Sequence, residues 1–369
     1  LQGRFREAEE AYLSSMELGS DFQVTARKGG LFLQIARYFH GRGDTPMAMQ
    51  WVKKSVVQFQ GAGHPRGERE ATVELAMVLL ADGKFEEALE YFTIAEQLAL
   101  PAAGLTGTVI HCLKAATLFV QGNLSRALDE VQKGRTAAER TKSREWGLFL
   151  DFLEARVRFE LGFYAEALEG LESALATEAV YDMPAARRVL YTWLGRAHAY
   201  VGGHATAMRI LNHCEDSWER QYFLAECHFF QQEYGPALAA CGRAISAERA
   251  AFRPPVERVV WADGFRDVEG RCLELARENA MELRLLHALQ GYLWGLEGSS
   301  ERAVEQLHSL TRGGRLPPSD PYQSLYHYFY ACVLPEVRKD DLDDSLTVLS
   351  KALKLLQQRA SKTEDSSLR

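Results

Sequence analysis

The chain has 369 residues, of which 47% are hydrophobic and 25% are charged, a composition typical of folded globular proteins and not of fibres or disordered segments. Its 43 Lys and Arg residues against 50 Asp and Glu residues give a net charge of −7, which provides no basic surface for nucleic acid. No apolar stretch approaches the roughly 20 residues that a membrane-spanning helix needs, so we expect this segment not to insert into a membrane.

Cysteine usage argues against a redox or metal site. The six cysteines include no Cys-x-x-Cys pair, and the closest approach to a zinc constellation is His213-Cys214 with Cys227-His228. Adjacent residues on a helix point about 100° apart, so these side chains are not arranged to share a metal ion. We therefore expect reduced core thiols, no metal and no cofactor. Free thiols favour the cytoplasm, but the sequence leaves a periplasmic location open and does not fix the compartment.

A repeat runs along most of the chain, in steps of 39 or 40 residues. Each copy has a Gly followed five residues later by an Ala: Gly3/Ala8, Gly43/Ala48, Gly83/Ala88, Gly122/Ala127, Gly162/Ala167 and Gly202/Ala207. Three less regular copies follow: Gln232 with Ala237, Gly298 with Ala303, and Leu342 with Ser345. The array therefore predicts about nine stacked units.

Each unit is predicted to be a helical hairpin. Apolar residues recur at helical spacing on both sides of each Gly, for example over 70–81 and 85–98. The Gly supplies the left-handed conformation that ends the first helix, and the Ala lies where the second helix crosses the first too closely for a larger side chain.

The pattern resembles the tetratricopeptide repeat, most clearly over Gly83 to Ala95, Gly162 to Leu168 and Leu194-Gly195 with Gly202 and Ala207. The usual period of that family is about 34 residues, so the longer period resembles the repeats of large bacterial signalling proteins. The resemblance implies an all-α fold, a right-handed superhelical solenoid of antiparallel helix hairpins whose first helices line a concave wall that binds another protein.

Two proline-rich breaks divide the array. Pro254-Pro255 interrupts a predicted helix, which suggests a regular array over 1–250 and an irregular continuation of the same solenoid over 251–369. Pro317-Pro318 marks the second break, before a last hairpin over 322–334 and 341–358. The sequence begins with half a repeat, at Leu1, which predicts a fragment of a longer protein.

Residues for catalysis are not apparent. No phosphate-binding loop, His-Glu-x-x-His or Gly-x-Ser-x-Gly motif occurs, and acidic pairs such as Glu86-Glu87 stand at starts of second helices, where they complement the helix dipole. We expect no enzyme within these residues.

The candidate site is the concave wall. Aromatic side chains bury large areas and arginine grips carboxylates, so both suit a protein-binding surface, and the charge of the three arginines disfavours burial. The helical register predicts a partner-binding groove of Arg37, Phe119, Phe149, Phe152, Arg156, Phe159, Arg196, Tyr200, Tyr222 and Phe229. For each aromatic residue, a role in the core between helices is the competing interpretation.

The leading hypothesis is a noncatalytic protein–protein interaction scaffold that helps assemble a larger complex, in signalling, envelope or motility machinery. Its partner would be a protein or peptide segment that is acidic and partly apolar, and self-association stays open. The alternative is a regulatory segment of a multidomain signalling protein or transcription regulator, which senses a ligand or peptide in the groove.

Overall fold

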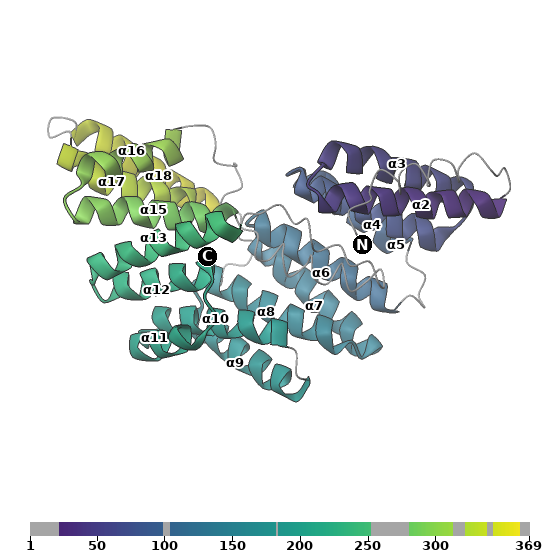
Figure 1. Ribbon diagram of the computed structural model, residues 1–369, viewed down its shortest axis with the longest axis horizontal. Helices are drawn as coiled ribbons and strands as arrows, with labels where there is room; N and C mark the ends of the chain where they lie inside the picture. The colour runs from purple at the N-terminus through teal and green to yellow at the C-terminus, as the bar shows by residue number, and fades with distance from the viewer. Residues whose placement is uncertain are drawn as a thin grey trace. The chain divides into compact units, whose positions relative to one another are not determined.

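The computed structural model describes residues 22–98, 104–181, 184–251, 280–312, 322–337 and 342–361. These residues form sixteen helices, which follow one another as antiparallel hairpins (Figure 1). The predicted all-α fold of successive hairpins is confirmed. No described helix is long and apolar enough to cross a membrane. The half repeat at Gly3 and both proline breaks lie outside the described residues.

Contacts divide the chain into two compact units. The first holds the described residues of Leu1–Thr117 and Glu130–Gly147, and the second those of Leu118–Asp129, Leu148–Phe252 and Glu274–Arg369. Helices of the first unit are α2 (Phe22–Gly41), α3 (Thr45–Gly61), α4 (Pro65–Ala81), α5 (Phe85–Gln97) and most of α6 (Gly104–Val120) and α7 (Leu124–Thr141). The sequence predicts a division near residue 250. The structure describes residues up to Ala251 and again from Ala280, so this division stays a prediction.

The second unit continues the series of hairpins. Its helices are α8 (Arg144–Glu160), α9 (Tyr164–Tyr181), α10 (Pro184–Tyr200), α11 (His204–His213), α12 (Trp218–Phe230), α13 (Tyr234–Ala251), α15 (Ala280–Leu296), α16 (Ser300–Arg312), α17 (Gln323–Val337) and α18 (Leu342–Ser361). Even-numbered helices up to α12, together with α15 and α17, are the first helices of the hairpins. Their partners are the second helices.

The interhelical glycines have the backbone conformation that the sequence predicts. Gly43, Gly83, Gly122, Gly162, Gly202 and Gly298 have φ between 73° and 89°, in the left-handed region. Gln232, which stands where the repeat expects Gly, adopts φ 61° as well. The turn geometry therefore depends on the position in the repeat, and it persists where the residue is not glycine.

Small residues allow the two helices of a hairpin to approach closely. The recurring alanines of the second helices, from Ala48 to Ala303, are fully buried. A second contact lies between Gly195 of α10 and Leu211 of α11, where an added Cβ would stand 2.7 Å from Leu211 Cγ. Gly291 and Leu307 repeat this contact in α15 and α16, also 16 residues apart. The residue four positions after the recurring alanine thus packs against a small residue of the first helix.

A buried carboxylate joins α6 and α7 in the first unit. Glu130 is 6% exposed, and its oxygens lie 2.8 Å from His111 Nδ1, 2.7 Å from Lys133 Nζ and 3.5 Å from Lys114 Nζ. Burial alone would raise the pKa of Glu130, but hydrogen bonds from His111 and Lys133 and the charge of Lys114 lower this pKa to about 2. The ionised form is therefore the one that the fold stabilises.

We expect Glu130→Gln to destabilise the protein at neutral pH by up to about 3 kcal/mol and to have little effect near pH 2. The folded-state pKa lies below its ordinary value of 4.5, so the contribution of Glu130 is complete above about pH 4.5 and is lost as the pH falls toward about 2. The destabilisation is measured from the urea unfolding midpoints of the unmodified protein and the variant between about pH 7 and pH 2. Glu139→Gln, at an exposed position of α7, is the control. A difference that does not shrink in acid would contradict the assignment.

Candidate functional site

Eight of the ten predicted groove residues are buried. Arg37 is 9% exposed, and Phe119, Phe149, Phe152, Arg156, Phe159, Arg196 and Tyr222 are between 1% and 5% exposed. Tyr200 and Phe229 are partly exposed. Arg37 belongs to the first unit and the other nine to the second. A partner-binding role stays a prediction, but the expectation that charge would keep the three arginines at an open surface is wrong.

Arg37 and Arg196 are buried because each pairs with a glutamate on the neighbouring first helix. Arg37 Nε of α2 donates to Glu74 Oε2 of α4 at 3.2 Å, and His40 Nδ1 lies 2.8 Å from the other oxygen of Glu74. Arg196 of α10 forms two hydrogen bonds with Glu226 of α12, at 2.8 and 2.9 Å. Desolvation is thus offset by charge pairing inside the row of first helices.

Aromatic rings complete the environment of the buried arginines. The Arg156 guanidinium lies 4.3 Å from the centroid of Trp193, and the Arg196 guanidinium lies 5.0 Å from the same ring. Arg196 is also within 5.7 Å of the ring centroids of Phe159, Tyr200, Tyr222 and Phe223. Desolvated cation–π contacts of this kind contribute about 2 kcal/mol or more. Arg156 and Arg196, two of the arginines that the sequence predicts to line one groove, are in contact with aromatic residues of the same predicted groove. They belong to the core of the protein.

Glu226 is the centre of this cluster. Besides Arg196 it accepts a hydrogen bond from the Tyr200 hydroxyl at 2.9 Å, and it is 6% exposed. Burial lowers the pKa of the Arg196 guanidinium most strongly, but Glu226, Tyr222 and Tyr200 together outweigh burial and raise that pKa well above its ordinary value. Burial and the nearby Glu226 also raise the pKa of Tyr200 well above its ordinary range. Arg196 therefore stays charged and Tyr200 stays protonated at neutral pH.

The start of α17 also meets the end of α8. Tyr322, which directly precedes α17, donates a hydrogen bond from its hydroxyl to Glu160 Oε2. The two residues are 162 positions apart in the sequence. This contact ties distant first helices of the second unit together, a link that neither the repeat nor its spacing predicts.

A continuous row of aromatic rings runs along the second unit, over seven helices from α8 to α17. Consecutive ring centroids are 4.6–6.4 Å apart, the range in which rings attract one another. The row, which we call the aromatic ladder, runs through Phe159, Tyr164, Tyr200, Phe230, Phe229, Tyr292, Phe329 and Tyr328, and it includes Tyr234, which contacts Phe229 beside this path. Only Phe159, Tyr200 and Phe229 of these were predicted as site residues.

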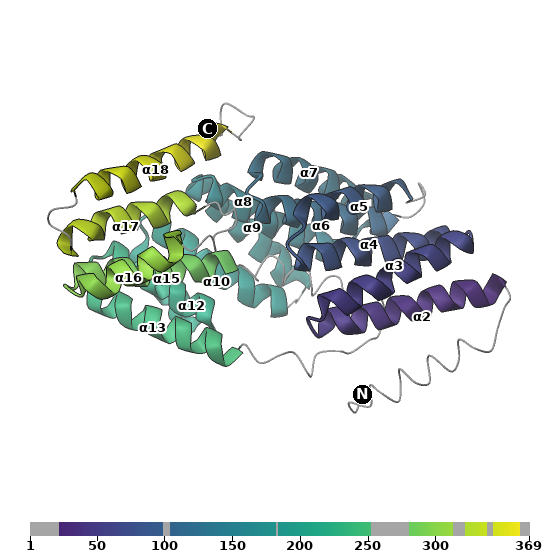
Figure 2. The same cartoon turned by 90° about the horizontal axis from the view of Figure 1, so that it is seen from above.

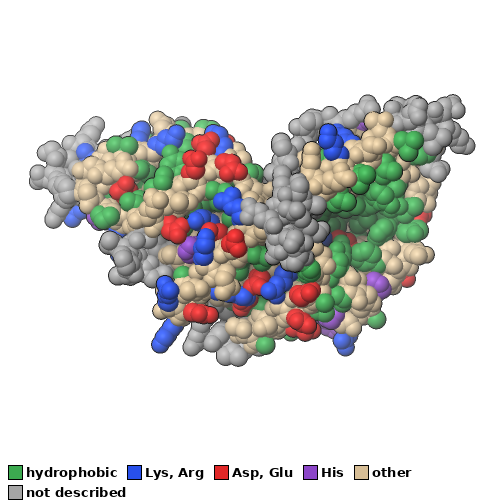
Figure 3. All heavy atoms as spheres, turned by 180° about the vertical axis from the view of Figure 1, so that it is seen from behind, with side chains coloured by type: hydrophobic (Ala, Val, Ile, Leu, Met, Phe, Trp, Pro, Cys, Tyr) green, Lys and Arg blue, Asp and Glu red, His purple; other side chains and the backbone are tan. Residues whose placement is uncertain are grey.

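Most of the aromatic ladder is accessible. Tyr328 is 47% exposed and Phe230 is 37% exposed, whereas Phe159 and Phe329 are buried. The remaining five rings are partly exposed. On the half of the molecule that holds α10 to α18, hydrophobic side chains gather around a hollow (Figure 3). Sequence reasoning missed Tyr164, Tyr234, Tyr292, Phe329 and Tyr328, although Tyr164 and Tyr234 each begin a second helix directly after a turn, which marks their position in the repeat.

The expected core location of the cysteines holds for Cys112, Cys227 and Cys241, which are buried, but it is wrong for Cys332, which is exposed, and Cys214 is partly exposed. No group of three or more His, Cys, Asp or Glu residues in the part of the chain that the structure describes is placed to hold a metal ion. Burial raises the pKa of Cys227 and of Cys241 to about 12, so both thiols are protonated at neutral pH.

Comparison with solved structures identifies the fold. A tetratricopeptide repeat protein from Parabacteroides merdae ATCC 43184 matches with a TM-score of 0.55 and 14% identity, over 84% of this chain and 99% of that chain. A Rap protein complexed with competence and sporulation factor matches with a TM-score of 0.59 and 14% identity, over 92% of this chain and 88% of that chain.

Sequence comparison adds one family. The model of a C-terminal domain named TP_0123_C matches residues 283–369. None of the curated proteins matches the chain. At 14% identity the structural matches establish the architecture alone: the chain has an all-α fold of successive helix hairpins, like that of these repeat structures.

Proposed function

We propose that this chain is a noncatalytic interaction scaffold that helps assemble a larger complex by holding a partner segment along the aromatic ladder. The supporting observation is the continuity of the ladder, because partly exposed rings on successive helices provide a long apolar surface at low entropic cost. The partner is a peptide segment, extended or helical, with apolar side chains spaced along it.

The prediction of an acidic partner can no longer be derived from the three arginines. An acidic partner was expected because three arginines would line the groove, but Glu226 already neutralises Arg196 and Glu74 already pairs with Arg37. The proposal therefore assigns the affinity to apolar contacts with the ladder, and a preference for acidic segments is tested independently by salt dependence.

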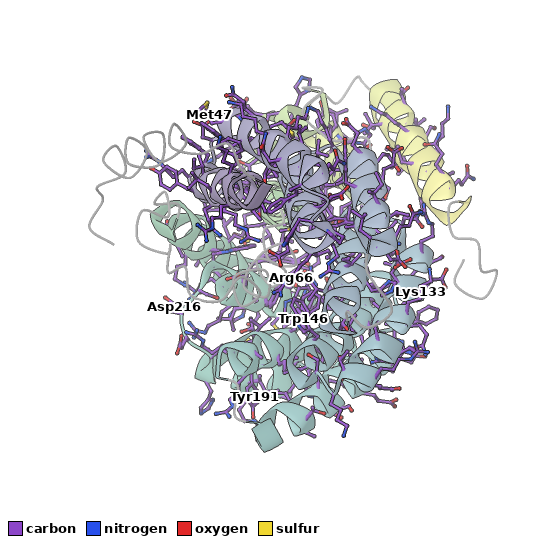
Figure 4. All side chains as sticks on the ribbon, turned by 90° about the vertical axis from the view of Figure 1, so that its right-hand side faces the viewer. Met47, Arg66, Lys133, Trp146, Tyr191 and Asp216 are labelled. Atoms are coloured by element: carbon purple, nitrogen blue, oxygen red, sulfur yellow. The ribbon has the colours of Figure 1, made fainter. Side chains whose placement is uncertain are left out.

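Replacing the two most exposed rings of the ladder, Phe230 near its middle and Tyr328 at its end, is expected to weaken peptide binding. Peptides selected from a random library on the unmodified protein should bind the Phe230→Ser and Tyr328→Ser variants about tenfold or more weakly, as expected for loss of an interface aromatic residue. Fluorescence anisotropy with the selected peptides measures the affinities. Tyr191→Ser is the matched control: Tyr191, labelled in Figure 4, is 44% exposed on α10 but is no member of the ladder. Equal loss in all three variants, or in none, would contradict the site.

The alternative is a regulatory function, and a contact of Tyr200 supports it. Tyr200 belongs to the ladder and also donates its hydroxyl to Glu226, so an occupant that moved the Tyr200 ring would disturb the buried pair of Arg196 and Glu226. A sensing segment predicts that a bound peptide changes hydrogen exchange within α10 and α12. A scaffold predicts protection confined to the ladder.

A further inference from the structure

Helix α18 carries an exposed stripe of leucines. Leu346, Leu349, Leu353 and Leu356 are 58%, 43%, 55% and 53% exposed. Their spacing of three, four and three residues places them on one face of the helix, in the pattern by which two helices pack side by side. We call these four residues the leucine stripe. An apolar surface of this extent on a soluble helix marks an interaction site.

The other hairpins bury the positions that α18 exposes. The residue four positions after the recurring alanine is Val52, Phe92, Val131, Leu171, Leu211, Cys241 or Leu307, and none of these side chains is more than 2% exposed. Leu349 is the corresponding residue of α18, four positions after Ser345. Its exposure therefore departs from a rule that the rest of the described array obeys.

The first helix of this last hairpin supplies a reason. Gly195 and Gly291 make room for Leu211 and Leu307, 16 residues further on, but the residue 16 positions before Leu349 is Val333. Val333 is 3% exposed and already packs against Gly295 of α15. A valine leaves less room than glycine for Leu349, and the buried residues of α18, which is in contact with α17, are instead Ser345 and Ala352, 8% and 6% exposed.

Second helices elsewhere are covered by the first helix of the next hairpin. Contacts of this kind join α3 to α4, α9 to α10, α11 to α12, α13 to α15, and α16 to α17. Figure 2 shows α18 at the end of this series, with α17 beside it and no described helix on its far side. Among the described residues, the leucine stripe is thus left uncovered.

We propose that the leucine stripe binds the leucine stripe of a second copy of this chain, with the two α18 helices antiparallel. The spacing is symmetric about its centre, so a two-fold axis there places Leu346 against Leu356 and Leu349 against Leu353 of the other copy. Ser350 and Gln357, the exposed residues that flank the stripe, are uncharged, so no like charges oppose each other there. The antiparallel arrangement also aligns the helix dipoles favourably.

The exposed fractions of the four residues add up to about two whole leucine side chains per copy, well below the roughly 800 Å² per partner of a stable interface. The dimer is therefore weak and requires high protein concentration. Sedimentation equilibrium of the full chain, from about 1 µM to about 1 mM, should show the mass rising toward that of a dimer. A mass that stays monomeric over the whole range would overturn the proposal.

Substitutions on the stripe locate the interface. Leu349→Glu and Leu353→Glu should each weaken dimerisation about tenfold or more, while far-UV circular dichroism and melting temperature stay unchanged because both side chains are exposed. Val57→Glu introduces the same charge at a side chain that is 62% exposed on α3, and it should dimerise like the unmodified chain. An equal effect of Val57→Glu would show that added charge, and not the stripe, is responsible.

Mixing charge variants tests the orientation. A mixture of Leu349→Glu and Leu353→Lys chains should form heterodimers more readily than either chain forms homodimers, because only the heterodimer places Glu against Lys in the antiparallel register. Sedimentation of the mixture and of each variant alone gives the comparison. No recovery in the mixture would exclude this antiparallel pairing.

Discussion

Replacing Glu226 with leucine is expected to destabilise the second unit by about 3–5 kcal/mol, the cost of leaving a buried charge without its partner. Glu226 is 6% exposed and Arg196 is 2% exposed, and no solvent can take over the two hydrogen bonds that join them. The Tyr200 hydroxyl would lose its acceptor as well. The midpoint and slope of urea unfolding, followed by far-UV circular dichroism, measure the effect.

Removing both charges should cost less than removing one. In the double variant Arg196→Met/Glu226→Leu the buried charges are replaced by apolar side chains among the surrounding rings, and such replacements are often neutral or stabilising. Arg188→Ala is the surface control, because the ion pair between Arg188 and Glu215 is largely exposed and contributes about 1 kcal/mol or less. If the double variant were no more stable than Glu226→Leu, the unpaired charge would not be the cause.

The burial of Arg156 and Arg196 decides which substitutions can test the groove hypothesis. The sequence suggests Arg156→Glu and Arg196→Glu as probes of partner binding. Both side chains are almost fully buried against rings, so a glutamate there is expected to unfold the second unit before binding can be measured. Exposed ladder residues such as Phe230 and Tyr328 are the informative positions.

The repeat made the hairpins predictable from the sequence. The residues that form a turn are neighbours in the sequence. At the first described turn, Gly43 has a positive φ, and the following Asp44 caps the second helix by accepting a hydrogen bond from Met47 N at 3.2 Å. The core alanines are likewise set by their distance from that turn. Short-range patterns of this kind are legible because residues within one helical turn determine them.

The burial of the arginines could not be predicted from the sequence in the same way. A periodic pattern places Arg196 on one face of α10, but whether that face is open depends on Glu226, 30 residues later, and on rings from two other helices, α8 and α12. The same holds for the aromatic ladder, whose rings come from seven helices and join only when the hairpins stack. Burial in a solenoid is a property of neighbouring repeats and not of one repeat.

Glycine-to-alanine substitutions at two helical positions of the second unit should have effects of opposite sign. Gly242 lies inside α13 with nothing within 4 Å of an added Cβ, so Gly242→Ala should stabilise the protein by about 0.5–1 kcal/mol through helix propensity. Gly195 lies inside α10, where the added Cβ would meet Leu211 Cγ at 2.7 Å and Cδ2 at 2.8 Å. Leu211 is fully buried and has no space to withdraw.

Gly195→Ala is therefore expected to destabilise the protein by about 1–3 kcal/mol, as overpacking of a core usually does, even though alanine is the better helix former. Urea midpoints of both variants and the unmodified protein are the measurement. The cause is checked with Leu211→Ala: this change alone costs about 2–5 kcal/mol, but it vacates the space that the new methyl group needs, so adding Gly195→Ala to it should be neutral or stabilising. If Gly195→Ala were stabilising in the unmodified background, close helix approach at the Gly195–Leu211 contact would not be what keeps glycine at this position of the repeat.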